Sequence, residues 1–436
     1  MSPPSNAQYA HIHGKWFDME CRDYPTAGDG RPAGLPSEPV YLDYNATTPV
    51  DARVAEAARP YWDQWFGNPS SDHAYSERPR QAVARAREQV AALIGAAPGE
   101  IVFTGSGSEA DQLAIRGAVL AGLRAVPDAT PGVITQVTEH PAVLACCEAL
   151  ERWHGVQVTR LPVDASGLVD PEAVADALAR PARSRGPAVV SVMLANNETG
   201  AIQPITQIAA AAHAHGALLH VDAAQAVGKT AVDVITLGAD LLTVVGHKMY
   251  APKGIGALYV RAGTTLEPVI YGGGQEHGLR AGTENVALTA ALGAAAELAA
   301  RDLADGAEAR LASLRDRLHA RLAAALPGRV ELNGPPDQRL PTTLNISITG
   351  LRGHELLAAV PGVAASTGSA CHSGQHTPSP VLTAMGLDEG RALAAIRLSV
   401  GRWTTAAGID AAVGHLADAA IRLAGPAAGR HSSVAS

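Results

Sequence analysis

The stretch LLTVVGHKMY, residues 241–250, joins a strand pattern to two polar residues. The mostly apolar run up to Val245 predicts a buried strand, and His247 and Lys248 lie just beyond its end. A buried lysine is costly because its charged form loses hydration. Desolvation would lower the pKa of Lys248 and make the neutral, nucleophilic amine accessible. The alternative is a lysine whose amine reaches the surface while its stem is buried.

Five further segments share this strand pattern and alternate with alanine-rich helical patterns. The expected strands cover residues 101–105, 132–137, 156–163, 188–195, 217–223 and 241–246. The expected helices between them cover residues 81–95, 141–155, 170–180 and 205–216. Strands that are apolar on both faces and alternate with helices predict an α/β fold with a mostly parallel sheet. In such sheets ligands gather at the carboxyl ends of the strands.

The chain divides into four expected parts. Residues 1–38 are rich in Pro, Gly and polar residues and are expected to form a flexible extension. Residues 39–290 form the expected large domain. A long helical stretch, residues 287–326, leads into a smaller α+β domain at 291–425, and residues 426–436 are expected to be a disordered tail.

The overall composition excludes several classes of partner. The chain has 436 residues and a net charge of −8, and its 34 basic residues are spread out instead of clustered. Nothing therefore indicates a nucleic acid or a membrane surface as partner, and a small molecule is favoured. The N-terminus has no signal-peptide pattern, and no apolar stretch is long enough to span a bilayer.

Cysteine is scarce, which bears on the cellular compartment. The only cysteines are Cys21, Cys146, Cys147 and Cys371, and no disulfide framework is indicated. Together with the missing signal sequence, this predicts a reducing compartment and a cytoplasmic location. Cys146 and Cys147 lie in a helical pattern and are interpreted as core residues.

The loop GSGSE, residues 105–109, precedes a helical pattern. The backbone amides of Gly107 and Ser108 and the Ser108 hydroxyl are therefore candidates for holding an anion at a helix N-terminus. Taken alone the signal is weak, because a glycine-serine loop is more often only a turn.

Two further side chains follow predicted strands. Asp222 follows the strand 217–221, and a buried acid there requires a partner that carries or shares a proton, although a helix N-cap is the plainer alternative. His140, in TEHP, can stack on an aromatic ring. An anion cradle, an acid for a pyridinium nitrogen, a stacking histidine and a Schiff-base lysine together meet the needs of pyridoxal phosphate.

Cys371 lies in STGSACHSGQHTPSP, residues 366–380, a composition typical of a mobile loop with an accessible thiol. His372 and His376 would favour its thiolate form. A zinc site is the competing interpretation, but three ligands on one short loop without a second ligand pair argue against a metal.

Arg397 alternates with apolar residues in the expected strand AAIRLSV, residues 394–400. A partly buried guanidinium must meet an anion, and an amino-acid carboxylate suits its bidentate geometry. An internal Asp or Glu is the alternative.

With these residues in place, the chain resembles the cysteine desulfurases, the NifS-like group of class V aminotransferase-fold enzymes that depend on pyridoxal phosphate. The resemblance covers about residues 40–422. It rests on a series of segments in a fixed order: YLDYNATTP, GNPSS, LANNETG, HVDAAQAVGK, GHKMYAPKGIGALYV, GGGQEHGLRAGTEN, GSACHSG and IRLSVGR. It implies the fold type I of pyridoxal-phosphate transferases, with a mostly parallel seven-stranded sheet and a smaller α+β C-terminal domain.

The resemblance implies three catalytic residues. Lys248 would form the Schiff base with the cofactor and move the Cα proton. His140 would stack on the cofactor ring and act in acid-base steps. Cys371 would take the sulfur of L-cysteine as a persulfide, releasing L-alanine, and would pass the sulfur to an acceptor protein.

It also implies the residues that hold the cofactor. Asp222 would keep the pyridine nitrogen protonated, and Gln225 would bond the ring hydroxyl. The phosphate would meet Gly107, Ser108 and His247.

The remaining implied contacts concern the substrate and the subunit interface. Asn197, which also touches the cofactor, and Arg397 would bind the substrate carboxylate. Thr283 would reach the phosphate of a neighbouring subunit, which implies a homodimer with shared sites.

The chain departs from the family pattern at four places, one of them Gln112 of GSGSEADQ, which replaces an amide of different reach. Ser108 replaces the usual threonine but keeps the hydroxyl, and Val245 replaces a serine and loses one phosphate contact. The segment ACHSGQHTPSPVL is closer to selenocysteine lyases. Release of selenium from L-selenocysteine is therefore the alternative function, and another class V aminotransferase reaction is a more remote one.

Overall fold

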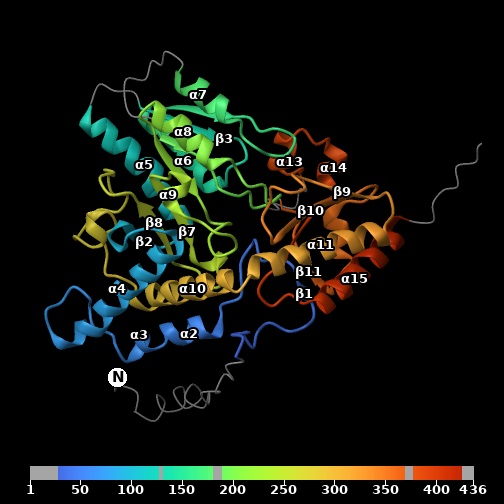
Figure 1. Ribbon diagram of the computed structural model, residues 1–436, viewed down its shortest axis with the longest axis horizontal. Coiled ribbons are helices and arrows are strands. Elements are labelled where there is room, and N and C mark those ends of the chain that lie inside the picture. Colours follow the sequence, from blue (N-terminus) through green and yellow to red (C-terminus); the bar gives the residue numbers. More distant parts are fainter. Residues whose placement is uncertain (1–27, 127–130, 180–188, 369–376, 425–436) are drawn as a thin grey trace, which may run out of the picture.

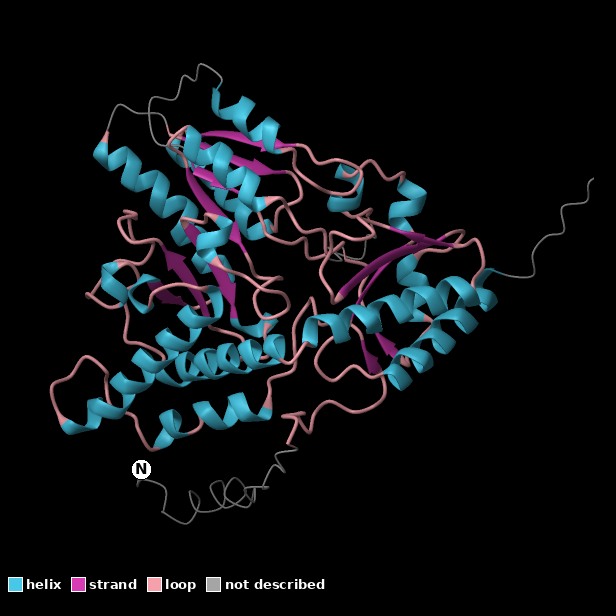
Figure 2. Ribbon diagram, in the orientation of Figure 1, coloured by secondary structure: helices cyan, strands magenta, loops and turns pink. Residues whose placement is uncertain are grey.

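The computed structural model describes residues 28–126, 131–179, 189–368 and 377–424. Figure 1 shows a larger body around a twisted sheet and a smaller one around β10, joined by the consecutive helices α10 and α11. Figure 2 shows that helices cover the sheet of the larger body.

The larger body is built on a seven-stranded sheet in the order β2-β8-β7-β6-β5-β3-β4. Its strands are β2 (Ile101–Thr104), β3 (Gly132–Gln136), β4 (Gln157–Leu161), β5 (Val189–Ser191), β6 (Leu218–Asp222), β7 (Leu241–Val245) and β8 (Gly256–Val260). All pairings are parallel except those of β8 with β2 and β7. The link from β7 to β8 is too short for a crossover, which explains this antiparallel pair.

Both faces of the sheet are buried because alternate residues of each strand contribute to different apolar clusters. Leu241 faces a cluster that contains residues of α5 and α6, and Leu242 faces the cluster that contains residues of α4, α8 and α10. The continuous apolar runs of the sequence arise from this two-sided burial.

The helices of the larger body lie before, between and after these strands. They are α2 (Ala52–Ala58), α3 (Pro60–Asp63), α4 (Ala74–Ile94), α5 (Gly107–Ala125), α6 (Pro141–His154), α7 (Pro171–Ala179), α8 (Ile205–Ala214), α9 (Val234–Leu237) and α10 (Val286–Ala304). Short 3-10 turns occur at η1 (Pro98–Glu100), η2 (Gly246–Lys248) and η3 (Glu276–Gly278). Cys146 and Cys147 are buried on α6, as expected for core residues.

The smaller body contains an antiparallel sheet in the order β12-β10-β9. Its strands are β9 (Val330–Leu332), β10 (Thr343–Ile348) and β12 (Ala395–Ser399), and its helices are α11 (Ala307–Ala325), α12 (Gly353–Ala358), α13 (Pro380–Ala384), α14 (Glu389–Leu393) and α15 (Ala406–Ala424). A separate pair joins β1 (Val40–Tyr41) in parallel to β11 (Val363–Ala364). The start of the expected large domain therefore packs on the smaller body.

The long helical stretch expected at residues 287–326 is two helices. Gly306 adopts a φ of 78°, a left-handed conformation that ends the run between α10 and α11. The expected boundary at residue 290 falls inside α10, which packs on α4 and α2. Among the described helices, none combines the length and apolarity that crossing a bilayer requires.

Candidate active site

A cavity of about 400 Å³ lies where the carboxyl ends of β6 and β7 meet the N-terminus of α5 and one side chain of β12. Nine of the predicted site residues line it: Gly107, Ser108, His140, Asn197, Asp222, Gln225, His247, Lys248 and Arg397. Residues far apart in the sequence thus meet at the edge of the sheet where parallel strands are expected to place ligands.

Lys248 lies on η2, the turn that directly follows β7. Its Nζ donates hydrogen bonds to the backbone oxygens of Asn45, at 2.6 Å, and Ala46, at 2.9 Å. Burial, and after it the Arg397 cation, lower the pKa of the amine to about 8, although the Asp222 and Asp43 carboxylates act against this. The amine is therefore poised for nucleophilic and proton-transfer chemistry near neutral pH.

Asp222 ends β6 and is buried. Its Oδ1 accepts a hydrogen bond from the backbone N–H of Ala224 at 2.9 Å, but residues 224–226 form a turn and no helix begins there, so the interpretation as a helix N-cap was wrong. Burial raises the pKa of Asp222, while the Ala224 N–H, His140 and Lys248 lower it. A cationic ring nitrogen in the cavity would favour the ionised form of this acid.

His140 stands at the N-terminus of α6, and its Nδ1 accepts a hydrogen bond from the Ala142 N–H at 3.2 Å. His140 lines the cavity wall and is exposed as a residue. Desolvation of its ring by the surrounding protein lowers the pKa of the imidazole. A neutral ring anchored through Nδ1 offers a flat face and a second nitrogen to a ligand.

The N-terminus of α5 forms one wall of the cavity. Ser106 caps the helix, its Oγ accepting from the Glu109 N–H at 3.2 Å. A Cβ built on Gly107 would lie 2.5 Å from Cγ2 of Val245, so glycine permits the close approach of helix and strand here. The free N–H groups and the positive end of this helix suit an anionic group such as a phosphate.

His247 lies beside this wall, where its Nδ1 shares a hydrogen bond of 3.1 Å with Oγ1 of Thr47. Burial lowers the pKa of His247 to about 4, and the cations Lys248, Lys253 and Lys229 act in the same direction. The ring is thus neutral at physiological pH.

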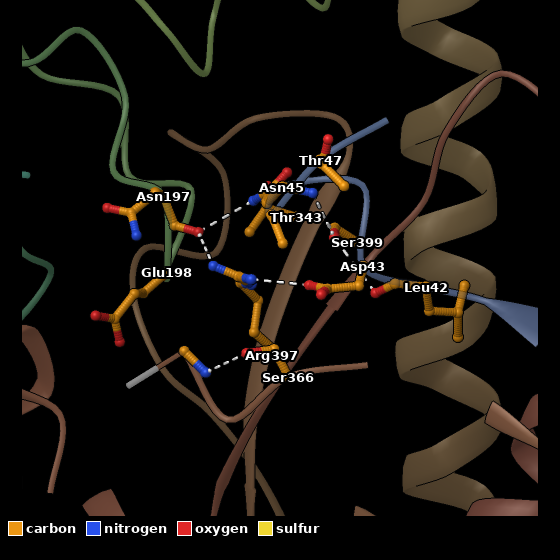
Figure 3. A network of polar contacts seen from close by, with 12 residues as sticks. Leu42, Asp43, Asn45, Thr47, Asn197, Glu198, Thr343, Ser366, Arg397 and Ser399 are labelled. Atoms are coloured by element: carbon orange, nitrogen blue, oxygen red, sulfur yellow. Dashed lines mark hydrogen bonds and ion pairs between the residues drawn. The ribbon is translucent and has the colours of Figure 1, made fainter. Parts of the chain in front are cut away.

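Arg397 enters the cavity from β12 and meets an internal acid, as the alternative interpretation held. Its Nη2 donates to Oδ1 of Asp43 at 2.8 Å, and its Nη1 donates to the backbone oxygen of Asn197 at 3.0 Å (Figure 3). Its Nε is buried without a partner among the described residues. The guanidinium therefore has both an internal counterion and an unused donor.

Two of the predicted site residues, Thr283 and Cys371, are not among the described residues that line this cavity. Thr283 lies in the exposed loop before α10 and is absent from the lining. Nearby, Arg280 of this loop forms an ion pair of 2.9 Å with Glu109 of α5. Cys371, together with His372 and His376, lies outside the described residues, and so does the zinc alternative at that loop.

Three polar residues at or beside the cavity had no predicted role. Asn45 and Asp111 line it, and Lys229 lies behind Gln225. Asp111 is buried, and its Oδ1 lies 3.7 Å from Nε2 of His220 but has no hydrogen-bond partner among the described residues. Burial and the Asp222 and Glu139 carboxylates raise the pKa of Asp111. Asn45 and Lys229 belong to the family segments YLDYNATTP and HVDAAQAVGK, but the sequence does not indicate which residues they contact.

Residues 40–412 match the family model described as Aminotransferase class-V. The chain belongs to the class V aminotransferase family. It is 47% identical over 373 residues to the cysteine desulfurase of Trichormus azollae, which covers 85% of this chain and 90% of the relative. It is 43% identical over 374 residues to the cysteine desulfurase NifS of Azotobacter vinelandii, with 85% and 90% covered.

Solved structures of this aminotransferase family share the fold. A NifS-like protein superposes with a TM-score of 0.78 at 32% identity, covering 87% of this chain and 98% of that one. A structure described as SspA in complex with cysteine gives a TM-score of 0.71 at 36% identity, covering 84% and 99%. The predicted family and its α/β fold with a mostly parallel seven-stranded sheet are thereby confirmed.

Proposed function

We propose that the protein is a pyridoxal-phosphate-dependent cysteine desulfurase that converts L-cysteine to L-alanine and transfers the sulfur to Cys371. One observation carries the proposal: the Lys248 amine, the Asp222 carboxylate and the N-terminus of α5 line a single cavity. The likeness to relatives named cysteine desulfurase supports the same reaction.

The residues present fit pyridoxal phosphate. The cavity of about 400 Å³ offers an amine, an acid and a cradle of N–H groups that a Cβ at Gly107 would disturb. Lys248 would hold the cofactor, Asp222 its ring nitrogen and Gln225 its ring oxygen. Ser108, Gly107 and His247 would hold its phosphate. When bound, the cofactor supplies an electron sink for the charge that develops at the substrate Cα.

The chain's own groups then perform the remaining tasks. Arg397 and Asn197, which both line the cavity, orient the substrate carboxylate. Lys248, whose amine has a pKa of about 8, takes the Cα proton. Asp222 keeps a proton on the ring nitrogen, and His140 covers the ring and assists in proton transfer.

Sulfur transfer balances because the substrate Cβ is reduced as the sulfur is oxidised to the persulfide level. The Cys371 thiolate attacks the substrate sulfur, a sulfur–sulfur bond forms, and the bond from Cβ to sulfur breaks. The electron pair of that bond remains with the carbon fragment, which takes up a proton and leaves as L-alanine. Cys371 retains a persulfide for an acceptor protein.

The assembly and location are part of the proposal. Thr283 of one subunit would reach the phosphate of its neighbour in a homodimer, which fits its exposed position outside the cavity of its own chain. The cysteine-poor sequence supports a cytoplasmic location.

Trapping and substitution test this function. Borohydride reduction of the cofactor-loaded protein should attach the cofactor to the Lys248 peptide, as seen by mass spectrometry, and Lys248→Ala should lose both the adduct and the visible absorbance. Cys371→Ala should retain the absorbance and lose alanine formation from cysteine. An adduct on another lysine, or full activity without Cys371, would overturn the proposal.

The segment ACHSGQHTPSPVL, residues 370–382, favours selenocysteine lyase as the second candidate. The ratio of kcat/KM for L-cysteine and L-selenocysteine separates the two activities, because alanine is the common product. A strong preference for selenocysteine would replace the desulfurase assignment.

A further inference from the structure

Lys229 is a buried lysine that the proposed mechanism does not use. It follows β6 within the segment HVDAAQAVGK, four residues after Gln225, and only 6% of it is exposed. Its side chain therefore has to find its hydrogen-bond partners inside the protein.

The partners of the Lys229 amine are amide oxygens. Its Nζ donates to Oε1 of Gln225 at 2.7 Å and to Oδ1 of Asn45 at 3.4 Å. No salt bridge to Lys229 occurs within the described ranges. Burial lowers the pKa of this amine well below its usual value, and the nearby Lys248 and Arg397 cations act in the same direction.

This contact determines which way the Gln225 amide points. The Lys229 amine donates this hydrogen bond, so the amide oxygen of Gln225 faces it and the NH₂ group faces the other way. That NH₂ group donates one hydrogen to the backbone oxygen of Asn45 at 3.1 Å. Its second hydrogen remains for a ligand in the cavity, which Gln225 lines.

The same backbone oxygen of Asn45 also accepts from Nζ of Lys248 at 2.6 Å. Asn45 is held in turn by its Nδ2, which donates to Oγ1 of Thr343 at 2.9 Å and to the backbone oxygen of Asn197 at 3.2 Å. A rotation of the Gln225 amide would therefore place its oxygen against an acceptor that Lys248 also uses.

We propose that Lys229 is a positioning residue that orients the Gln225 amide so that its N–H, and not its oxygen, meets the ring oxygen of the cofactor. A donor at this position stabilises the anionic ring oxygen. The nitrogen that joins Lys248 to the cofactor then gains less from being protonated beside that oxygen, so its pKa is lower. The inference rests on the proposed function, because it assumes that pyridoxal phosphate occupies the cavity.

The test follows the visible absorbance of the cofactor-loaded protein as a function of pH. Lys229→Met should raise the apparent pKa of the chromophore by about one unit. This is the effect of losing one hydrogen bond, from the Gln225 N–H to the charged ring oxygen. Lys253→Met is the matched control, because it removes an exposed cation that acts on His247 without touching Gln225. It should leave the chromophore pKa unchanged.

A double-mutant cycle separates orientation of Gln225 from a general effect of charge. Gln225→Met alone should produce the same rise, and adding Lys229→Met to it should change nothing further. Additive shifts, or an unchanged pKa in Lys229→Met, would overturn the inference. If Lys229→Met does not fold, Lys229→Gln, whose amide ends one bond short of the lysine amine, should give the same rise.

The outcomes also distinguish this inference from the proposed function. If the wild-type protein shows no visible chromophore and no adduct on Lys248, the cofactor assignment itself fails. If the wild-type chromophore is normal and Lys229→Met leaves its pKa unchanged, only the role of Lys229 fails.

Discussion

Asp43 and Arg397 are 354 residues apart in the sequence, yet Oδ1 of Asp43 lies 2.8 Å from Nη2 of Arg397. Figure 3 shows the guanidinium between this carboxylate and the backbone oxygen of Asn197. The pair places a neutralised cation at the cavity wall, and the Nε of Arg397 is buried without a hydrogen-bond partner among the described residues.

Asp43→Asn should destabilise the cofactor-free protein, because it leaves the buried Arg397 cation without its anion. We expect the free energy of unfolding to fall by about 2 kcal/mol, less than for a fully buried pair because Asp43 is partly exposed. Urea unfolding measures this loss, and added L-alanine should recover part of it by supplying a carboxylate. Asp410→Asn, which breaks the exposed pair with Arg317, should change stability little. Equal losses in both variants would contradict the prediction.

The lowered pKa of Lys248 predicts a pH dependence of stability. Between its folded value of about 8 and its ordinary value of 10.5, the unfolded chain holds more protons than the folded one. The free energy of unfolding should therefore rise with pH across this window, by an amount on the order of 1–3 kcal/mol, while the full penalty is present below about pH 8.

Urea unfolding of the cofactor-free wild type and Lys248→Met at several pH values measures this contribution together with the coupling of Lys248 to Lys229. Lys248→Met should lack the rise, and Lys253→Met should keep it. Identical pH profiles for the wild type and Lys248→Met would refute the predicted contribution.

Val245→Ser should tighten cofactor binding. Val245 lines the cavity beside Gly107, and a hydroxyl there would add a hydrogen bond to the phosphate. We expect the dissociation constant of the cofactor to fall about tenfold, the effect of one added hydrogen bond to a charged group, as measured by fluorescence titration. Val244→Ser is the matched control: Val244 is in the core, so the substitution should cost stability without a gain in affinity. Weaker binding in Val245→Ser would show that the phosphate lies elsewhere.

Glu276→Gln should weaken the attachment of the loop that carries Thr283. Glu276 is buried and accepts from both Nη atoms of Arg87, at 2.7 and 2.8 Å, and from the Phe103 N–H at 2.8 Å. Removing its charge strands the Arg87 cation, so we expect a loss of about 3 kcal/mol in denaturant unfolding. Glu267→Gln, which loses the charge that pairs with the exposed Arg124 and keeps an acceptor for the Tyr271 hydroxyl, should be close to wild type. If Glu267→Gln lost stability and Glu276→Gln did not, the prediction would be contradicted.

The sequence predicted the parts of this fold that depend on local pattern. The apolar runs ending at Val245 and Asp222 became β7 and β6. The helical patterns at residues 81–95 and 141–155 overlap α4 and α6, and each extends one residue beyond the end of its helix. Such patterns are readable because side-chain periodicity and helix capping act over a few residues. Where a local signal was overlooked, as at Gly306 between α10 and α11, the helical prediction ran too far.

Only the tertiary structure decided which polar groups meet. The sequence alone named Lys248, Asp222 and Arg397, and its family segments indicated a shared site. It did not reveal that Asp43 neutralises Arg397, or that Lys229 and Asn45 hold the amide of Gln225. These contacts join residues up to 354 positions apart, and the pKa of each group depends on how much water the whole packing removes from it. Local sequence sets the strands and helices; their assembly sets the distances and the desolvation on which the chemistry depends.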